Sequence, residues 1–393
     1  MTAPPVNAEC DMKVTNLSGT HFEMGKQLRE QTLELIAIEW ESAIGTFITD
    51  LKIDETIAEN MLAAFSEEAT TKISKTLSKH APNQLQLIKG MVEGRKSSPV
   101  NIEAKHFYLA LYFDMILSDW PTQYKMFKNG GCSGIIIKPE ASQSGELLLG
   151  RNYDLTYSLG MTQVLKQCSP TDGFKTIAFT QSLWAGCHAG MNEEGLVIYY
   201  NLNHPLRDYD RTHRGVPYGV ILQDALETCA TADEALEYIK NVKRSSGANL
   251  TVGDPKNAYV IEVSRKKYGV RTPEDGVLAE TNHYVSPEMQ SENLPEWPIL
   301  RYTYRPLRDE LITTHKRYET EVSLLKEGLA KGKISMDYLK SILRSHDPNK
   351  KHSPCNHGPV GGTLASIITK PALKEMFIAV GQPCLSTYQK YTL

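Results

Sequence analysis

The chain has 393 residues, of which 41% are hydrophobic, and its formal net charge at pH 7 is -3. This length suits one large or two modest domains with a substantial core. The charge lacks the basic excess of a general nucleic-acid-binding protein, and no apolar run approaches the roughly 18 residues of a membrane-spanning helix. The start, MTAPPVNAECDMK, lacks the basic and apolar regions of a secretory signal peptide. We therefore expect a cytoplasmic protein that binds neither nucleic acid nor a membrane.

The first third of the chain, residues 1–131, is predicted to be mostly helical. A short strand comes first, and a helix follows it after Gly19-Thr20, where threonine is a favourable N-terminal cap. The spacing of apolar residues predicts further helices near 55–80, 82–94 and 103–117.

Residues 132–393 have a different pattern, in which short runs rich in Ile, Val, Leu and Tyr alternate with turn residues. The predicted strands are CSGIIIK, ELLLGRN, FKTIAFTQ, GLVIYYNLN, NLTVGD, NAYVIEVS and the closing pair LASIITK and EMFIAVG. Two predicted helices lie among them, GVILQDALETCA and one that begins with a capping box of Thr231 and Glu234. A further helix is predicted at about 320–344. The whole pattern indicates an α+β protein with a helical first third.

The seven cysteines are odd in number, scattered, and never spaced C-x-x-C. This usage favours reduced thiols over a disulfide framework or a structural zinc site. Cys355-Asn356-His357, with His352 and Cys384 not far away in sequence, fits no common zinc spacing, so a loop with one buried cysteine is the favoured interpretation. We expect no metal and no cofactor.

One cysteine has unusual neighbours, in the stretch KNGGCSGIIIK around Cys132. If the chain were cut between Gly131 and Cys132, Cys132 would carry a thiol and a free α-amine on the same residue. Since a thiol ordinarily has a pKa of about 8.5 and an α-amine one of about 7.7–8.0, the amine can accept the proton of the thiol near neutral pH. Glycine allows backbone conformations through which the thiol could reach the Gly131 carbonyl. The alternative is a Gly-Gly turn before a strand that starts with a buried cysteine.

Polar residues at the ends of other predicted strands strengthen the first interpretation. A hairpin from Cys132 would return Arg151 and Asp154 to its side, where the arginine could favour the thiolate and the carboxylate could hold the α-amine. Asn203 and Asn282 each follow an apolar strand, and such amides are suitable donors to an oxyanion in acyl transfer. Each feature is weak alone, but together they are specific.

In this order, the motifs resemble those of the N-terminal-nucleophile (Ntn) hydrolases, specifically the acyl-coenzyme A:6-aminopenicillanic acid acyltransferase group. The resemblance covers nearly the whole chain and rests on LSGTHFEMGKQL, GGCSG, GRNYD, DGVLAETNHY and the closing segment TLASIITKPALKEMFIAVGQPCLSTYQKYTL. GRNYD and the two asparagine strands are also similar to bile-salt hydrolases and penicillin V acylases. In those relatives the cysteine follows only a methionine or a short leader, whereas here 131 residues precede it, which points to self-processing.

This resemblance implies a four-layer αββα fold and cleavage between Gly131 and Cys132. Residues 1–131 and 132–393 would then be two fragments that stay associated as one compact unit. The resemblance also assigns roles to five residues: Cys132 as nucleophile, Asp154 as the group that orients its amine, Arg151 beside the thiol, and Asn203 and Asn282 as oxyanion donors. Many family members carry an arginine where this chain has Asn356, so no substrate contact is assigned to that segment.

The implied substrate is a small acyl amide or acyl thioester, which is converted through a thioester on Cys132. Hydrolysis of a linear N-acyl bond is slightly favoured over acyl transfer to an amine. The alternatives left open are an unprocessed Ntn-fold binding protein and an unrelated thiol enzyme that uses Cys355 beside His357. A homo-oligomer is compatible with the sequence.

Overall fold

The computed structural model describes residues 12–51, 56, 70–94, 106–107, 110, 131–203, 215–293, 305–359 and 361–393. Side chains at 43–51 and 305–311 are outside this description. The helix predicted near 103–117 and much of the one near 55–80 fall outside the described residues, while helical backbone continues through 70–80.

The larger of the two sheets has eight strands. In spatial order they are β1 (Lys13–Gly19), β4 (Gln163–Pro170), β5 (Thr176–Gln181), β6 (Ala189–Asn192), β7 (Val197–Asn203), β8 (Gly247–Gly253), β9 (Ala258–Val263) and β10 (Tyr268–Arg271). All neighbours are antiparallel except β1 and β4, which are parallel. The first strand of the chain therefore joins the sheet that the later strands build.

The second sheet has six strands, all antiparallel to their neighbours. Their spatial order is β11 (Val277–Glu280), β2 (Ser133–Ile137), β3 (Leu148–Thr156), β12 (Gly361–Lys370), β13 (Glu375–Val380) and β14 (Gln389–Thr392). Every residue of β2 is buried, as expected for a central strand that is covered on both faces. Its Ile-Ile-Ile run therefore lacks the polar alternation of a half-exposed strand.

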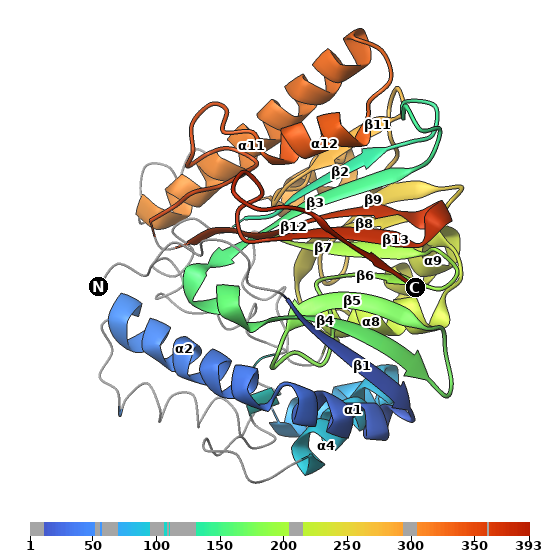
Figure 1. The fold of residues 1–393 in the computed structure, drawn as a ribbon, viewed down its shortest axis with the longest axis vertical. Coiled ribbons are helices and arrows are strands. Elements are labelled where there is room, and N and C mark those ends of the chain that lie inside the picture. The colour runs from blue at the N-terminus through green and yellow to red at the C-terminus, as the bar shows by residue number, and fades with distance from the viewer. Residues whose placement is uncertain are drawn as a thin grey trace.

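The two sheets pack face to face, and helices cover their outer faces (Figure 1). The helices are α1 (His21–Gln31), α2 (Leu33–Leu51), α4 (Pro82–Glu93), α8 (Tyr218–Thr228), α9 (Ala232–Asn241), α11 (Arg305–Ala330) and α12 (Met336–Leu343), with short 3-10 turns η1 (Tyr157–Thr162), η3 (Pro287–Glu292) and η4 (Pro371–Leu373). Helices α8 and α9 pack on the eight-stranded sheet, and α11 and α12 pack on the six-stranded sheet. The resulting order of helix, sheet, sheet and helix confirms the predicted α+β class and its four layers.

A buried hydroxyl pair links the two sheets inside this sandwich. The Tyr199 hydroxyl on β7 lies 2.7 Å from the Thr369 hydroxyl on β12 and donates to the Leu149 carbonyl at 3.3 Å. Residues 199, 201 and 203 alternate along β7, so all three side chains project from the same face of the sheet. The asparagine-rich end of β7 therefore faces the six-stranded sheet.

The predicted strands are confirmed, and the structure adds β4, β6, β10 and β14, which the sequence pattern did not predict. The helix expected at about 320–344 is wrong in its extent. Helix α11 begins earlier, at Arg305, and ends before Gly332, whose φ of 128° is accessible mainly to glycine. Ser335 then caps the separate helix α12 through a 3.1 Å bond from the Tyr338 backbone N–H.

Both predicted threonine caps are present, although only one forms a reciprocal capping box. At α1, Thr20 accepts from the Glu23 backbone N–H, and the Glu23 carboxylate accepts from the Thr20 backbone N–H. At α9, Thr231 accepts from the Glu234 backbone N–H, but the Glu234 carboxylate accepts from Ala230 instead. The capping-box prediction at Thr231 is therefore half correct.

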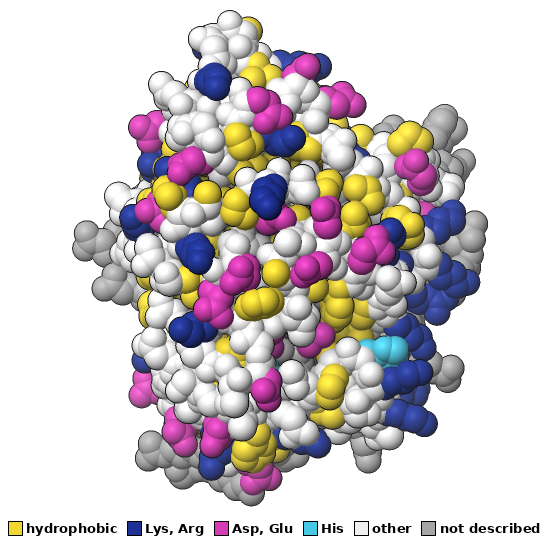
Figure 2. All heavy atoms as spheres, turned by 90° about the vertical axis from the view of Figure 1, so that its right-hand side faces the viewer, with side chains coloured by type: hydrophobic (Ala, Val, Ile, Leu, Met, Phe, Trp, Pro, Cys, Tyr) yellow, Lys and Arg dark blue, Asp and Glu magenta, His cyan; other side chains and the backbone are white. Residues whose placement is uncertain are grey.

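The surface carries charges of both signs. On the face in Figure 2, acidic and basic side chains are interspersed over most of the area, while Lys and Arg gather along one edge. Within the described ranges, no helix has the length and apolar composition that crossing a membrane requires.

Candidate active site

Cys132 immediately precedes β2 and is almost completely buried. Strands β2 and β3 form the predicted hairpin, with Gly134 opposite Arg151 and Ser133 opposite Asn152. This register brings the Arg151 guanidinium back to the start of β2, where its Nη2 lies 3.5 Å from the Cys132 Sγ. The structure therefore brings these two predicted site residues together.

Arg151 is completely buried and is held by two backbone carbonyls, those of His188 and Tyr200. Burial raises the pKa of the Cys132 thiol, because a thiolate is costly in an apolar interior. Arg151 acts in the expected direction and lowers that pKa, while the Asp154 carboxylate raises it further. In the uncut chain burial is the larger effect, so the arginine alone does not leave the thiol ionised.

Asp154 lies on β3, where Thr363 of β12 pairs with it across the sheet. Its side chain is buried, and burial raises the pKa of its carboxyl to about 7, an effect that Arg317, Thr363 and Arg151 partly oppose. Neither carboxylate oxygen makes a hydrogen bond of normal geometry with a described residue. A buried carboxyl in this state can accept a proton or a cationic donor.

Asn282 lies just after β11, and its side chain contacts the backbone of Cys132, the residue that carries the thiol. Its Oδ1 accepts the Cys132 backbone N–H at 2.9 Å, and its Nδ2 donates to the Leu202 carbonyl at 2.7 Å. The Asn282 backbone N–H is fixed by the Thr314 hydroxyl at 2.8 Å. The side chain therefore holds the nitrogen of Cys132, while one of its own amide hydrogens is directed at the end of β7.

Asn203 is the last residue of β7, and it is connected to the segment around Asn282 through Asn249. Its Nδ2 donates to the Asn249 Oδ1 at 2.9 Å, and the Asn249 Nδ2 donates to the carbonyls of Thr281 and His283, both at 2.9 Å. Asn203 and Asn282 thus belong to one polar network. The oxyanion roles assigned to them remain predictions.

Arg317 is a site residue that the sequence interpretation missed. It lies on α11, is completely buried, and donates to the Cys132 carbonyl, to the Asn282 Oδ1 at 2.6 Å and to the Ser133 hydroxyl at 3.3 Å. The available signal was a stripe of Thr314, Arg317 and Glu321 at helical spacing on the buried side of α11. Because the predicted helix began near 320, this stripe was not recognised.

Asn201 is a second residue without an assigned role. It is completely buried on β7, two residues before Asn203, and neither of its amide atoms has a hydrogen-bond partner among the described residues. Unsatisfied buried amides are uncommon, so this one is available to a group that enters the space between the sheets. The sequence feature that could have revealed Asn201 is YYNLN, in which two asparagines share one face of a strand.

Gly131 has no room for a side chain. A Cβ atom at residue 131 would lie 2.2 Å from the Arg317 Nη2 and 2.9 Å from the Asn282 Oδ1. The close approach of Arg317 therefore excludes a side chain.

The other predicted cysteine–histidine pair is also in contact, with 3.3 Å between the Cys355 Sγ and the His357 Nε2. Cys355 is completely buried, and burial raises the pKa of its thiol. His352 is directed elsewhere, because its Nδ1 lies 2.7 Å from the Thr313 hydroxyl. Between the pair, the Asn356 backbone N–H donates to the Thr363 hydroxyl at 2.9 Å, so this loop contacts the strand beside Asp154.

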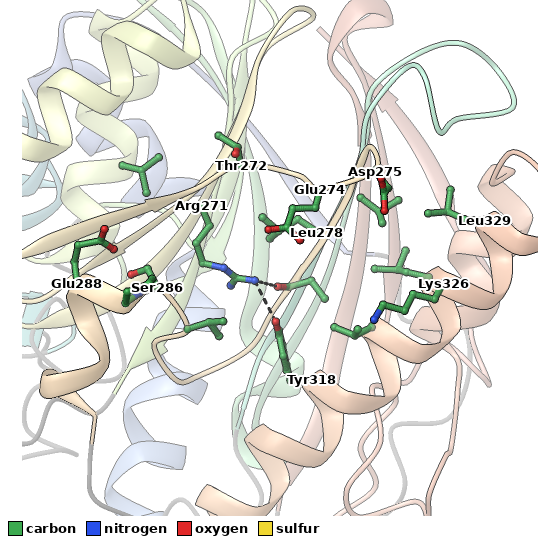
Figure 3. A pocket seen from close by; sticks show the side chains of 17 residues that line it. Arg271, Thr272, Glu274, Asp275, Leu278, Ser286, Glu288, Tyr318, Lys326 and Leu329 are labelled. Carbon is green, nitrogen blue, oxygen red and sulfur yellow. Dashed lines mark hydrogen bonds between the residues drawn. The ribbon is translucent and has the colours of Figure 1, made fainter.

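A surface pocket of about 600 Å³ lies between β10, β11, η3 and α11 (Figure 3). Inside it, the Arg271 guanidinium donates to the Ala279 carbonyl at 3.1 Å and to the Tyr318 hydroxyl at 3.3 Å. Cys132, Arg151, Asp154, Asn203 and Asn282 are not among its lining residues. The pocket is therefore separate from the Cys132 cluster.

Comparison with solved structures finds similar chains of low sequence identity. They include an N-acylethanolamine-hydrolyzing acid amidase ortholog from Caenorhabditis elegans (19% identity, 62% of this chain and 94% of that chain covered, TM-score 0.44). A mutant conjugated bile acid hydrolase from Clostridium perfringens (13%, 67% and 97%, 0.41) and penicillin V acylase from Agrobacterium tumefaciens (12%, 63% and 83%, 0.37) are also similar. No curated protein matches the sequence.

A family model matches residues 141–384, which is more than half of the chain. The matched part contains Arg151, Asp154, Asn203 and Asn282, while Cys132 precedes it. The chain belongs to the acyl-coenzyme A:6-aminopenicillanic acid acyl-transferase family.

Proposed function

We propose that the chain cleaves itself between Gly131 and Cys132, and that Cys132 then acts as the nucleophile of an amide hydrolase. One observation carries the proposal. The Sγ of Cys132 lies 3.5 Å from Arg151, and the backbone nitrogen of the same residue is held by Asn282 at 2.9 Å. The thiol and the future α-amine thus lie in one buried cluster of polar groups.

Cleavage begins when the Cys132 Sγ attacks the Gly131 carbonyl carbon. The C–N bond breaks, the nitrogen of Cys132 takes up the proton lost by the thiol, and Gly131 becomes a thioester on Cys132. Water then attacks the thioester and releases the Gly131 carboxylate and the free thiol. Arg317 and Asn282 bond the carbonyl and the nitrogen of Cys132, which fixes one side of the reacting peptide.

The new α-amine becomes the base for the thiol. The pKa of an α-amine is ordinarily about 7.7–8.0, which suits proton transfer from the thiol near neutral pH. Asp154 is the partner for the resulting ammonium group, because its buried carboxylate has no hydrogen bond of normal geometry to a described residue. An ammonium group would supply both the charge and the donor that a buried carboxylate needs.

During turnover the thiolate attacks the acyl carbonyl of a small N-acyl amide. The leaving nitrogen takes the proton that the α-amine received, and the acyl group remains on Cys132 as a thioester, which water hydrolyses. Asn203 and Asn282 donate to the oxyanion, a contribution of about 3–4 kcal/mol for each preorganised donor. Acyl transfer from a thioester donor to an amine is the alternative outcome at the same thioester.

The test is a denaturing gel and an intact-mass measurement on freshly purified protein and on Cys132→Ala. Since 131 of 393 residues are one third of 44.0 kDa, cleavage gives fragments of roughly 15 and 29 kDa. We expect both fragments from the wild type, the larger one beginning Cys-Ser-Gly, and an intact Cys132→Ala chain. Under native conditions the two fragments should elute together from a sizing column.

A panel of N-acyl amides and acyl thioesters, assayed with and without an amine acceptor, then distinguishes hydrolysis from transfer. Cys355→Ala tests the rival nucleophile, because the Cys355 Sγ lies 3.3 Å from the His357 Nε2. If the folded wild type remains uncut and inactive, the self-processing proposal fails and an unprocessed binding protein is the better interpretation. If Cys132→Ala retains activity while Cys355→Ala abolishes it, the nucleophile was assigned to the wrong cysteine.

A further inference from the structure

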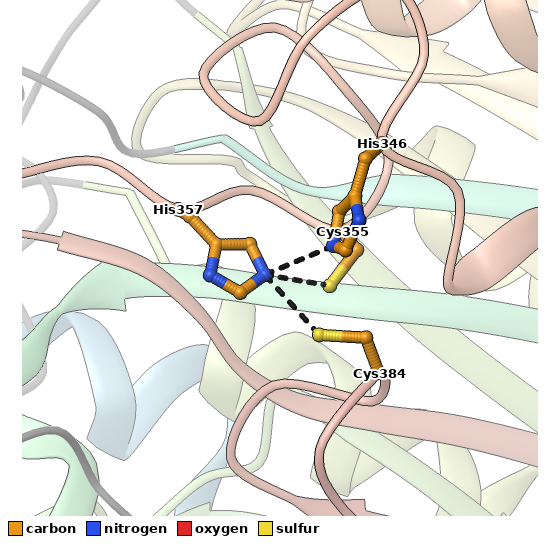
Figure 4. Close-up of side chains that lie close together, drawn as sticks. All are labelled: His346, Cys355, His357 and Cys384. Atoms are coloured by element: carbon orange, nitrogen blue, oxygen red, sulfur yellow. Dashed lines mark hydrogen bonds between the residues drawn. The ribbon is translucent and has the colours of Figure 1, made fainter.

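A second cluster of reactive side chains lies where the loops after α12 and β13 meet (Figure 4). It consists of His346, Cys355, His357 and Cys384, and one nitrogen or sulfur atom of each lies within 4.8 Å of those of the others. Two loops that are separate in sequence supply these four residues, which is why linear spacing gave no zinc pattern. The expectation of a loop with a single buried cysteine overlooked His346 and the approach of Cys384.

The contacts of His357 are too many for hydrogen bonding. Its Nε2 lies 3.3 Å from the Cys355 Sγ, 3.3 Å from the Cys384 Sγ and 3.1 Å from the His346 Nε2. A ring nitrogen has either one hydrogen or one lone pair, so it cannot bond three partners at once. A shared cation at the centre would account for the convergence of all four groups.

The distances fit tetrahedral coordination of a small ion. With Zn–S near 2.3 Å and Zn–N near 2.0–2.1 Å, a tetrahedron places two nitrogens about 3.3 Å apart and a nitrogen and a sulfur about 3.6 Å apart. The observed 3.1 Å and 3.3 Å lie within a few tenths of an ångström of these values. Two thiolates would also neutralise a divalent ion, which suits a site in which Cys355 is completely buried.

We propose that these four residues bind one zinc ion in a closed Cys2His2 site. Two thiolates and two imidazoles are the ligands that favour zinc, and four protein ligands leave no position open for a substrate. Binding releases the two thiol protons to solvent. The site is structural, and it is separate from the Cys132 nucleophile.

The position of this site explains what the ion would stabilise. Asn356 lies between two of the ligands, and its carbonyl accepts from the Thr363 backbone N–H at 3.0 Å. Thr363 pairs with Asp154 across β12 and β3. The Asn152 Nδ2 also donates to the Pro354 carbonyl at 2.8 Å, next to Cys355. An ion at the cluster would therefore hold this loop against the strand that carries Asp154.

Metal content measured by inductively coupled plasma mass spectrometry tests the proposal without an activity assay. We expect about one zinc per chain in wild type purified without chelator, and the same in Cys132→Ala. Cys384→Ser and His346→Ala should each retain less than about a tenth of that amount. Cys229→Ser is the matched control, since it removes a buried cysteine that is outside the cluster and should leave the zinc content unchanged.

A cobalt experiment on the wild type keeps the test independent of whether the variants fold. Replacement of the metal by Co(II) should produce thiolate-to-cobalt charge-transfer absorption and the visible bands of tetrahedral cobalt. The proposal is overturned if reduced wild type neither contains nor takes up a stoichiometric metal, or if Co(II) binds without thiolate absorption. Full zinc content in both ligand variants, or a Cys355–Cys384 disulfide in protein whose thiols were blocked at lysis, would overturn it as well.

Discussion

Two arginines lie beside Cys132 and differ in the groups that they contact. Arg151 contacts the sulfur, whereas Arg317 donates to the carbonyl of Cys132 and to the amide oxygen that holds its nitrogen. Both guanidinium groups are completely buried. A buried arginine is stable only when carbonyls or carboxylates satisfy it, so each is fixed rigidly by its partners.

Gly131→Ala is expected to slow self-cleavage at least tenfold. The new methyl group would lie 2.2 Å from the Arg317 Nη2, so the guanidinium must move away from the Cys132 carbonyl and the Asn282 Oδ1 to which it donates. Overpacking of this kind costs about 1–3 kcal/mol. The measurement is the fraction of intact chain on denaturing gels during a time course after synthesis.

Gly219→Ala is the control for that substitution. A Cβ atom at residue 219 has its nearest neighbour, the Cys187 carbonyl oxygen, at an ordinary 3.4 Å, so cleavage should proceed at the wild-type rate. Wild-type cleavage in Gly131→Ala as well would show that the close approach of Arg317 is not needed for processing.

A buried carboxyl beside Arg317 makes stability depend on pH. Burial raises the pKa of Glu321 from 4.5 to about 8, and Ser133 and Arg317 oppose this shift only partly. Between about pH 4.5 and 8 the folded chain therefore holds a proton that the unfolded chain has lost, so the free energy of unfolding falls as pH rises through this window. Glu280 and Asp154, each with a pKa raised to about 7, act in the same direction.

Glu321→Gln should make this loss of stability shallower, because the amide cannot ionise. Urea unfolding at pH 5, 6.5 and 8, in a Cys132→Ala background that keeps the chain uncut, measures the slope. Glu319→Gln is the control, since the Glu319 side chain is 60% exposed and pairs with Lys316 at the surface. An equal slope in Glu321→Gln and in the parent would contradict the assignment of a raised pKa to Glu321.

At the scale of the elements, the two sheets meet through apolar residues and a few buried polar groups. Tyr199 on β7 carries the hydroxyl that reaches Thr369 on β12 and the Leu149 carbonyl on β3. It thus connects the strands that supply Asn203, Arg151 and Asp154. Such a bond fixes the spacing between the sheets, which apolar packing alone defines less strictly.

Tyr199→Phe is expected to lower the free energy of unfolding by about 1–3 kcal/mol, because the Thr369 hydroxyl loses its buried partner. Urea unfolding of the uncut Cys132→Ala chain measures this change. The control is Tyr259→Phe, whose lost hydroxyl bonds Asp233 near the surface at 2.6 Å, and we expect a smaller loss there. An equal loss of unfolding free energy in the two variants would indicate that the inter-sheet bond contributes no more to stability than the surface bond.

At the scale of the whole molecule, the residues before Cys132 are part of the same structure as those after it. Strand β1 pairs with β4 over seven residues, and His21 lies 2.9 Å from the Glu227 carboxylate. Gln84 donates to the same carboxylate at 2.8 Å, and the Ser182 hydroxyl donates to Glu39 at 2.5 Å. Cutting one peptide bond leaves these contacts in place, which supports our proposal that the fragments stay associated.

The sequence by itself determined the class of the protein and the identity of several residues at its centre. Strands and caps follow from local periodicity and local hydrogen bonding, so β2, β3, β7 and the Thr20 cap could be predicted. The hairpin register that joins Cys132 and Arg151 is likewise set by residues close together in the chain. The oxyanion roles of Asn203 and Asn282 stay predictions.

Only the tertiary structure decided what residues far apart in sequence do together. Arg317 lies 185 residues from Cys132 and reaches it because α11 packs on the six-stranded sheet. The Cys2His2 cluster needed the loop after α12 and the loop after β13 to meet, and neither loop has a periodic pattern that places it. Long-range packing depends on how whole faces of elements fit, so local spacing could identify these side chains but could not bring them together.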